Sequence, residues 1–281
     1  MGVAALGYVA GSHTVDTKLD SAGVADLGYV AGTKTLTEIL TESTDAGNKK
    51  ITNLASPTDS TDAATKAYVD LLEAKIADLE GVKDIDNNRY EIETIGSQTW
   101  MAENLKTTRY NDGLVIPLKA DNTDWETAST MGAPAYTWYG NDVSNLITYG
   151  ALYNWYAIDT VLNGNKNVCP TGWHLPTDGE WTTLTSYLGG AVAAGGKMKE
   201  AGLAHWNSPN EGATNESSFA GLRGSNGTLN DIGFYGYWWS STEHNTNTTY
   251  AWFRGLFYND GSVNRYLLNK GSGLSVRCLR D

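Results

Sequence analysis

The segment Cys169-Pro-Thr-Gly-Trp-His-Leu-Pro-Thr-Asp-Gly-Glu-Trp181 decides the fold class, because it places a strand directly before a helix. Its Trp-His-Leu part reads as a short strand, and the proline that follows makes a turn. Thr177 is the expected N-cap, and Glu180, three residues later, is its capping-box partner. The helix is expected to run to about Leu188 and to end at Gly189-Gly190. The segment therefore indicates a mixed α and β fold.

Further elements are expected on both sides of this segment. Upstream, residues 84–100 read as a hairpin, because residues Tyr90 to Thr94 alternate between apolar and polar and Gly96-Ser97 supplies a turn. Downstream, a second short helix is expected around Gly196–Ala201. The polar stretch Asn207–Glu216 is expected to be a surface loop.

The tryptophans divide the chain into two different parts, since all ten lie at or beyond Trp100. Large aromatic side chains dominate cores and binding surfaces, and a segment poor in large apolar residues cannot fold on a core of its own. We therefore expect residues 84–281 to form a compact head. Residues 1–58 are expected to be an extended fibre segment, and residues 59–83 a coiled-coil oligomerisation helix.

Charge and composition exclude several classes of protein. The net charge of −12 argues against a nucleic-acid partner, because no basic stripe is present to neutralise phosphates. No run of 18 apolar residues occurs, so membrane insertion is not expected, and the first residues lack a signal-peptide pattern. Two cysteines, Cys169 and Cys278, are too few for a disulfide scaffold or a four-ligand zinc site, although they could form one bridge.

The fibre segment contains a short repeat. The hexapeptide Leu-Gly-Tyr-Val-Ala-Gly occurs at Leu6–Gly11 and again at Leu27–Gly32. Two copies favour a repeating fibre module, and a chance echo of two short strings is the alternative.

Residues 48–70 carry a more specific signal. Their sequence, Asn-Lys-Lys-Ile-Thr-Asn-Leu-Ala-Ser-Pro-Thr-Asp-Ser-Thr-Asp-Ala-Ala-Thr-Lys-Ala-Tyr-Val-Asp, resembles a motif that recurs in bacteriophage tail-fibre proteins, where it leads into a trimeric helical bundle. The residues themselves support the start of a helix. Pro57 stops any helix upstream, and Asp59 and Asp62 place carboxylates near the new N-terminus.

An apolar seam follows, with 3-4-3 spacing; its members are Val69, Leu72, Ile76 and Leu79. A helix of two heptads is marginal in water, so it must associate with copies of itself or pack on the head. The side-chain choice favours a dimer, whereas the tail-fibre resemblance implies a homotrimer, which is the state expected here. A monomeric amphipathic linker helix is the alternative.

The head carries a second resemblance, through five ordered motifs. They are Trp100-Met-Ala-Glu-Asn-Leu105, Tyr149-Gly-Ala-Leu-Tyr-Asn-Trp155, the segment 169–181, Trp239-Ser-Ser-Thr-Glu243 and Ser275-Val-Arg-Cys278. Together they resemble the Fibrobacter succinogenes major paralogous domain, a family similar to C-type-lectin-fold proteins and to relatives of the formylglycine-generating enzyme. The resemblance implies an α+β, C-type-lectin-like head with a twisted antiparallel sheet, two helices and long loops.

The same resemblance implies a disulfide, because Cys169 and Cys278 occupy neighbouring places in the lectin-type fold. Such a bridge would close a loop of about 109 residues. Two buried free thiols are the alternative.

No enzyme activity, cofactor or metal site is expected. The four histidines form no metal-binding pair, and the second reactive cysteine of the formylglycine-generating relatives is missing near Cys278. Asp84-x-Asp-x-Asn88 lacks the later Gly and Glu of a calcium loop, so a polar turn is expected there. The string His205-Trp-Asn-Ser-Pro-Asn210 matches neither calcium motif of sugar-binding lectins.

The stretch from Gly233 to Ser275 interleaves scaffold-type residues with exchangeable polar and aromatic ones. This mixture of Tyr, Asn, Ser and Asp is the composition of antibody-type paratopes. It also resembles the variable region of diversity-generating-retroelement proteins, which are receptor binders with a lectin fold. An ordinary exposed loop and edge strand is the alternative. The candidate ligand-binding residues are Tyr235, Tyr237, His244, Asn245, Asn247, Tyr250, Tyr258, Asn259, Asp260, Ser262, Asn264, Tyr266 and Asn269.

These resemblances together imply a phage tail-fibre or receptor-binding protein at the tip of the virion. Its head is expected to bind a polysaccharide or a protein on the surface of the host cell. A bacterial cell-surface adhesin or lipoprotein with the same head is the first alternative. An enzyme of the formylglycine-generating type is the second.

Overall fold

The computed structural model describes residues 58, 67–72, 81–219 and 233–281. The chain divides into two units between Ala77 and Asp78, and the second of them, Asp78–Asp281, contains the head.

Six residues of the expected oligomerisation helix are described, and these residues, 67–72, are helical. Val69 and Leu72 of the seam expose 38% and 40% of their surface in the single chain. Ile76 and Leu79 lie outside the described residues, as do both copies of the hexapeptide. The oligomeric state therefore stays a prediction.

The end of the expected 59–83 helix needs a correction. Val82–Lys83 form strand β1, which pairs with β2 (Arg89–Tyr90). Gly81 precedes this strand with a φ of +68°, and a Cβ atom there would lie 2.1 Å from the Tyr90 carbonyl oxygen. Only glycine fits this close approach with a positive φ, so the chain turns at Gly81 and the head begins before residue 84.

Short sheets make up the β part of the described head, and neighbouring strands run antiparallel. One sheet has the order β3 (Ile92–Ile95), β4 (Gln98–Met101), β11 (Leu279–Arg280), β7 (Trp173–His174), and a small one pairs β5 (Tyr136–Trp138) with β6 (Ala151–Tyr153). The longest strands form a third, with the order β10 (Asp260–Asn269), β9 (Tyr250–Phe257), β8 (Tyr235–Glu243). The β3–β4 pairing confirms the expected hairpin.

The helices of the described head are α4 (Asn122–Met131), α5 (Leu146–Tyr149), α6 (Trp155–Ile158), α7 (Asp178–Tyr187) and α8 (Ala191–Met198), with 3-10 turns η1 (Tyr139–Asn141) and η2 (Val143–Asn145). Helix α7 begins as expected, because the Thr177 hydroxyl accepts a hydrogen bond from the Glu180 amide and the Glu180 side chain bonds back to Thr177. The resemblance implied two helices, and the described head contains more than two; the ten-residue helix α4 in particular was not expected.

The second expected helix was misplaced. Helix α8 ends at Met198 rather than near Ala201, and Gly195 and Gly196 lie inside it. A Cβ atom on Gly195 would lie 2.2 Å from the Ser262 carbonyl oxygen, and one on Gly196 would lie 2.2 Å from the Gly212 carbonyl oxygen. These glycines let the helix approach other backbone segments closely, so they do not mark a helix end.

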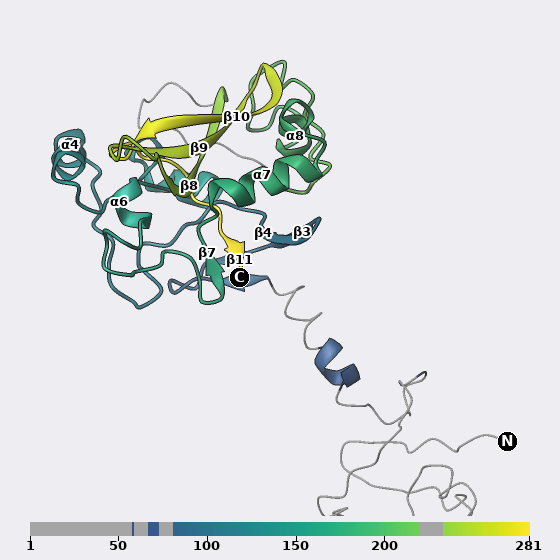
Figure 1. The fold of residues 1–281 in the computed structure, drawn as a ribbon, viewed down its shortest axis with the longest axis horizontal. Coiled ribbons are helices and arrows are strands. Elements are labelled where there is room, and N and C mark those ends of the chain that lie inside the picture. The colour runs from purple at the N-terminus through teal and green to yellow at the C-terminus, as the bar shows by residue number, and fades with distance from the viewer. Residues whose placement is uncertain (1–57, 59–66, 73–80, 220–232) are drawn as a thin grey trace, which may run out of the picture. The chain divides into compact units, whose positions relative to one another are not determined.

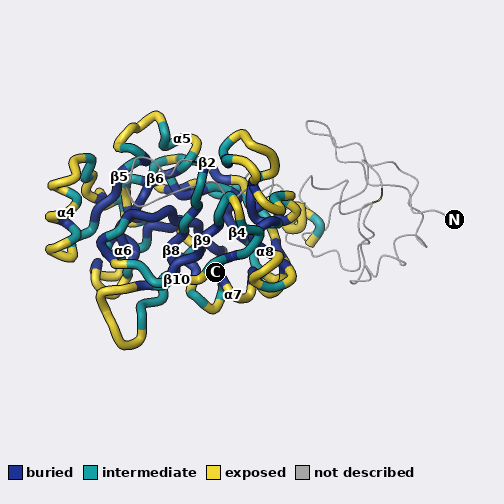
Figure 2. Tube along the Cα trace, turned by 90° about the horizontal axis from the view of Figure 1, so that it is seen from above, coloured by how far each residue is buried: buried dark blue, intermediate teal, exposed yellow. Residues whose placement is uncertain are grey.

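Two buried clusters form the core and explain where the tryptophans fall. The first contains Trp155, Trp173 and Trp239, and the second contains Trp100, Trp181, Trp206 and Trp238. Figure 2 shows the buried chain running through β8, β9 and β4, with exposed residues on α4, α5 and the outer loops. In Figure 1, β8, β9 and β10 lie at one side of the head, with α7 and α8 beside them.

The structure contains a disulfide between Cys169 and Cys278, the pair that the resemblance implied. Both residues are fully buried in the first core cluster. The bond joins the segment before β7 to the segment before β11, so it ties the two ends of the β11–β7 pairing together.

None of the described helices is both long enough and apolar enough to cross a membrane.

Candidate ligand-binding surface

All thirteen candidate residues fall in the sheet β10-β9-β8 or in the connections between its strands. The register places Tyr237 opposite Gly255 and Gly255 opposite Asn264, while Phe253 lies opposite Tyr266. Because side chains alternate between the faces of a strand, these residues share one face. The neighbouring positions, such as Arg254, share the other.

Five aromatic rings on this face touch in a continuous chain, which we call the aromatic cluster: Tyr235, Tyr237, Phe253, Phe257 and Tyr266. The rings of Tyr235 and Tyr237 lie parallel, 5.8 Å apart. Phe257 meets the Tyr235 ring edge-on at 5.2 Å and lies parallel to Tyr266 at 6.3 Å. Phe253 meets Tyr237 at 5.3 Å and Tyr266 at 6.0 Å.

The cluster joins a ring that is anchored in the core to a ring that is open to solvent. Phe253 is 6% exposed and belongs to the first core cluster, whereas Tyr266 is 46% exposed. Tyr235, Tyr237 and Phe257 are half-buried. Rings that pack on one another are held rigidly, and Tyr adds a polar tip to a large apolar area. The surface is therefore ordered before any ligand arrives.

Phe253 and Phe257 were not among the candidate residues. Both lie on β9, where the period of two of a strand places them on the same face as Ala251 and Gly255, and this spacing was the signal that could have found them. A Cβ atom on Gly255 would come within 3.1 Å of Phe257 and 3.3 Å of Tyr237. The glycine therefore leaves room for the rings beside it.

Polar candidates border the cluster at the start of β10, and we call Asp260, Ser262 and Asn264 the polar rim. The Asp260 carboxylate accepts hydrogen bonds from the Asn264 side-chain amide at 3.2 Å and from the Ser262 amide at 2.9 Å. These bonds lower the pKa of Asp260 below its ordinary value. The rim thus presents an ionised carboxylate that can accept hydrogen bonds from a ligand's hydroxyl or amine groups.

The remaining candidates do not join this surface. Tyr258 packs against Phe234, with ring centres 5.0 Å apart, and against the second core cluster. Asn259 is exposed in the turn between β9 and β10. His244, Asn245, Asn247, Tyr250 and Asn269 lie at the far end of the sheet, where Tyr250 pairs with Asn269. The two ends of β9, Tyr250 and Phe257, lie seven residue steps apart, roughly 23 Å.

The opposite face of the sheet is held to helix α7 by two arginines. Arg254 donates to the Asp178 carboxylate at 2.7 Å, and Arg265 donates to both of its oxygens at 2.9 and 3.1 Å. Burial alone would raise the pKa of Asp178, but these hydrogen bonds and charges outweigh burial and lower it. Arg265 also stacks on Trp252, with its guanidinium carbon 3.3 Å from the ring centre.

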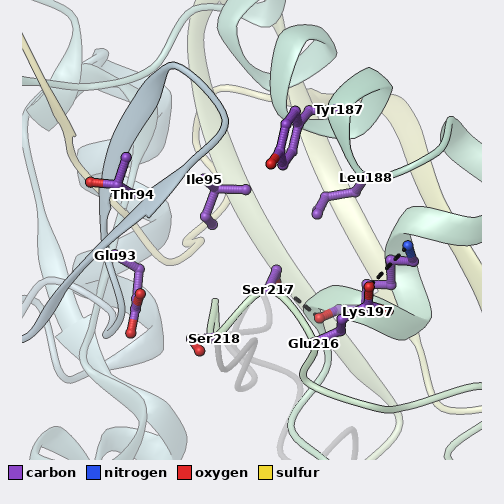
Figure 3. A pocket seen from close by; sticks show the side chains of 9 residues that line it. All are labelled: Glu93, Thr94, Ile95, Tyr187, Leu188, Lys197, Glu216, Ser217 and Ser218. Carbon is purple, nitrogen blue, oxygen red and sulfur yellow. Dashed lines mark hydrogen bonds and ion pairs between the residues drawn. The ribbon is translucent and has the colours of Figure 1, made fainter.

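A separate hollow of about 370 Å³ is lined by residues of β3, the end of α7, α8 and the segment 216–218 (Figure 3). Ile95 and Leu188 are its buried apolar residues, and Lys197 and Glu216 form an ion pair of 3.4 Å at its edge. The other lining residues are Glu93, Thr94, Tyr187, Ser217 and Ser218. It contains none of the thirteen candidates. Across the described ranges, no group of three or more His, Cys, Asp or Glu residues is placed to hold a metal ion.

The fold and the site together define an α and β head that presents an aromatic and polar sheet surface on a packed, disulfide-linked frame. The chain belongs to the Fibrobacter succinogenes major domain family, whose model matches residues 94–280. No curated protein and no solved structure matches the chain.

Proposed function

We propose that this protein is a phage tail-fibre receptor-binding protein whose head binds ligands on the surface of host bacteria. In this proposal the head has a C-type-lectin-like fold, and residues 59 to about 80 join three chains in a helical bundle. The observation that carries the proposal is the aromatic cluster, which lies partly open on a rigid sheet beside the polar rim. Aromatic anchors flanked by adaptable polar groups are typical of recognition surfaces.

Three heads on one stalk would bind by avidity. A second contact made by a linked head takes place at a high effective concentration, so three weak sites together can exceed a single site by roughly 10²–10⁴-fold. A small and partly open surface such as this one then suffices to hold a virion on a cell.

The test is a binding measurement with the full chain on whole bacterial cells from a panel of strains. Tyr266→Ala should weaken binding about tenfold or more, because the ring is an exposed member of the cluster. Its melting temperature should change little, since surface substitutions are usually worth less than about 0.5 kcal/mol.

Tyr187→Ala is the matched control, because Tyr187 is a 65% exposed tyrosine at the end of α7, outside the cluster. Equal binding by both variants would contradict the proposal. So would a large loss of stability in Tyr266→Ala, which would make this ring a core residue.

The second candidate function is a bacterial cell-surface adhesin or lipoprotein with the same head. The Cys169–Cys278 disulfide favours it, because an exported protein folds in an oxidising compartment where such bonds form, whereas the cytosol in which a phage protein is made keeps thiols reduced. The complete gene distinguishes the two, since an adhesin needs an export signal. Retroelement diversification of the C-terminal stretch has its own test: a reverse-transcriptase gene beside a near-copy of the 3′ end of this gene.

A further inference from the structure

We propose that Lys199 is a positioning residue, whose buried ammonium group holds the turn between β9 and β10 in the conformation that presents the polar rim. The inference rests on the proposed function, because it concerns the same recognition surface. It adds a residue that lies outside the surface and acts on it through backbone carbonyl groups.

The Lys199 side chain is fully buried, and its ammonium group donates three hydrogen bonds. The acceptors are the backbone carbonyl oxygens of Glu211 at 2.8 Å, Phe257 at 2.8 Å and Asp260 at 2.9 Å. An ammonium group has three N–H donors and no acceptor. Every donor is therefore used, and each acceptor is a main-chain group.

Two of these carbonyls belong to the two ends of the same turn. Phe257 is the last residue of β9 and Asp260 is the first residue of β10. Phe257 also supplies a ring to the aromatic cluster, and Asp260 supplies the carboxylate of the polar rim. A single ammonium group thus fixes the spacing between cluster and rim.

The third carbonyl ties this turn to a loop. Besides accepting from Lys199, Glu211 donates its amide to the Tyr258 carbonyl oxygen at 2.7 Å. The pairing of β9 with β10 shifts register between Asp260 and Val263, so the regular ladder does not by itself fix this part of β10. The Lys199 and Glu211 contacts hold the turn where the ladder is irregular.

The end of helix α8 positions Lys199 beside the turn between β9 and β10. The helix ends at Met198, and Lys199 follows as its C-cap in an extended conformation. Gly195 and Gly196 let the helix lie against Ser262 and Gly212, so the side chain needs to span only a short distance to the turn. Lys197, two residues earlier, instead pairs with Glu216 at the protein surface.

A positive charge suits this cage of oxygens. Three carbonyl dipoles converge on one point, and loss of the ammonium group would remove one hydrogen bond from each of these buried acceptors. Burial lowers the pKa of Lys199 to about 8, so the group remains mostly protonated at neutral pH. An apolar side chain of equal length would fill the space but supply none of these three hydrogen bonds.

The experiment compares Lys199→Ala with wild type by hydrogen–deuterium exchange of the segment 257–262. We expect exchange at least about tenfold faster in the variant, because the turn opens more often. n-Propylammonium at tens of millimolar, which replaces the missing carbons and the charge, should slow the exchange again. n-Propanol, similar in size but neutral, should not. Lys197→Ala is the matched control and should exchange like wild type.

Wild-type exchange rates in Lys199→Ala, or equal rescue by n-propanol and n-propylammonium, would overturn the proposal. Should the alanine variant fail to fold, Lys199→Met keeps most of the packing without the charge, and wild-type exchange in that variant would overturn it equally. Binding of wild type and Lys199→Ala to a strain from the cell panel is measured in parallel. The variant with faster exchange of segment 257–262 should also bind more weakly. If no strain binds wild type, the proposed function fails while the exchange result still decides the role of Lys199.

Discussion

Asp178 shows how a single residue resolves a conflict inside the sheet. The register places Arg254 directly opposite Arg265 on neighbouring strands, and like charges in such a pair repel each other. Asp178, the first residue of α7, bonds to both guanidinium groups. Its negative charge cancels the repulsion and at the same time ties the helix to the face opposite the aromatic cluster.

This contact predicts a pH dependence. The pKa of Asp178 is lowered in the folded protein, so the folded state favours the ionised form. The stability that Asp178 contributes is therefore present above the ordinary pKa of an aspartate and is lost as the pH falls through the lowered pKa. Asp178→Asn should lower the melting temperature near neutral pH, and wild type and variant should converge as the pH falls below the lowered pKa of Asp178.

Thermal unfolding of both proteins across this range checks the prediction. A temperature difference that stays the same at acid and neutral pH would show that the loss comes from packing and not from charge. Arg265→Gln should also lower the melting temperature near neutral pH, but by less than Asp178→Asn does. Arg265 is half-exposed, and its loss leaves Asp178 paired with the buried Arg254.

At the scale of elements, the sequence predicted those helices and strands whose positions are set by neighbouring residues. The capping box of Thr177 and Glu180 located the start of α7, and alternation located the β3–β4 hairpin. Helix α4 escaped prediction because only Ala128 of its residues is buried, so it has no apolar stripe to detect. Helix α8 was misplaced because its internal glycines are required by close contacts with backbone segments that are distant in the sequence.

The candidate surface was predictable as a region but not as a set of residues. Composition located it within 233–275, whereas the shared face of Asn264 and Tyr266 follows from strand β10 and its register with β9. Tyr258 is not part of the surface because it packs against the second core cluster, and Tyr250 is not part of it because it lies at the other end of the sheet. Both depend on tertiary packing and register, which composition does not encode.

The helix that contains residues 67–72 leads to a prediction about assembly. Val69 and Leu72 belong to the expected seam, and both are over a third exposed in the single chain. Replacing both with Ser should remove the apolar contact between chains. Light scattering should then give the mass of one chain in place of the three expected for wild type.

Leu71→Ser is the matched control for this element. Leu71 is 50% exposed and adjacent to Leu72, but it lies off the 3-4-3 spacing. Its substitution should leave the mass unchanged. A wild-type protein that is already monomeric at micromolar concentration would end the trimer hypothesis.

At the scale of the whole molecule, the disulfide joins cysteines 109 residues apart. In the chain-entropy model, closing such a loop restricts the unfolded chain by about 4–5 kcal/mol. The double variant Cys169→Ala, Cys278→Ala should lose stability of this order, measured by denaturant unfolding without reductant. Wild type in reductant should fall toward the variant, and unchanged midpoints in both would show that the bond contributes little.

The main-chain ladder between β9 and β10 has a consequence for how such a molecule changes over generations. Its register pairs Asn264 with Gly255 and Tyr266 with Phe253, and the ladder itself is made by peptide groups, which every amino acid except proline supplies in full. Under the proposed function, substitutions at the partly exposed Asn264 and the exposed Tyr266 would therefore change the ligand-binding surface while the ladder keeps its peptide groups. In the proposed receptor-binding role, one inherited scaffold would then serve a whole repertoire of specificities.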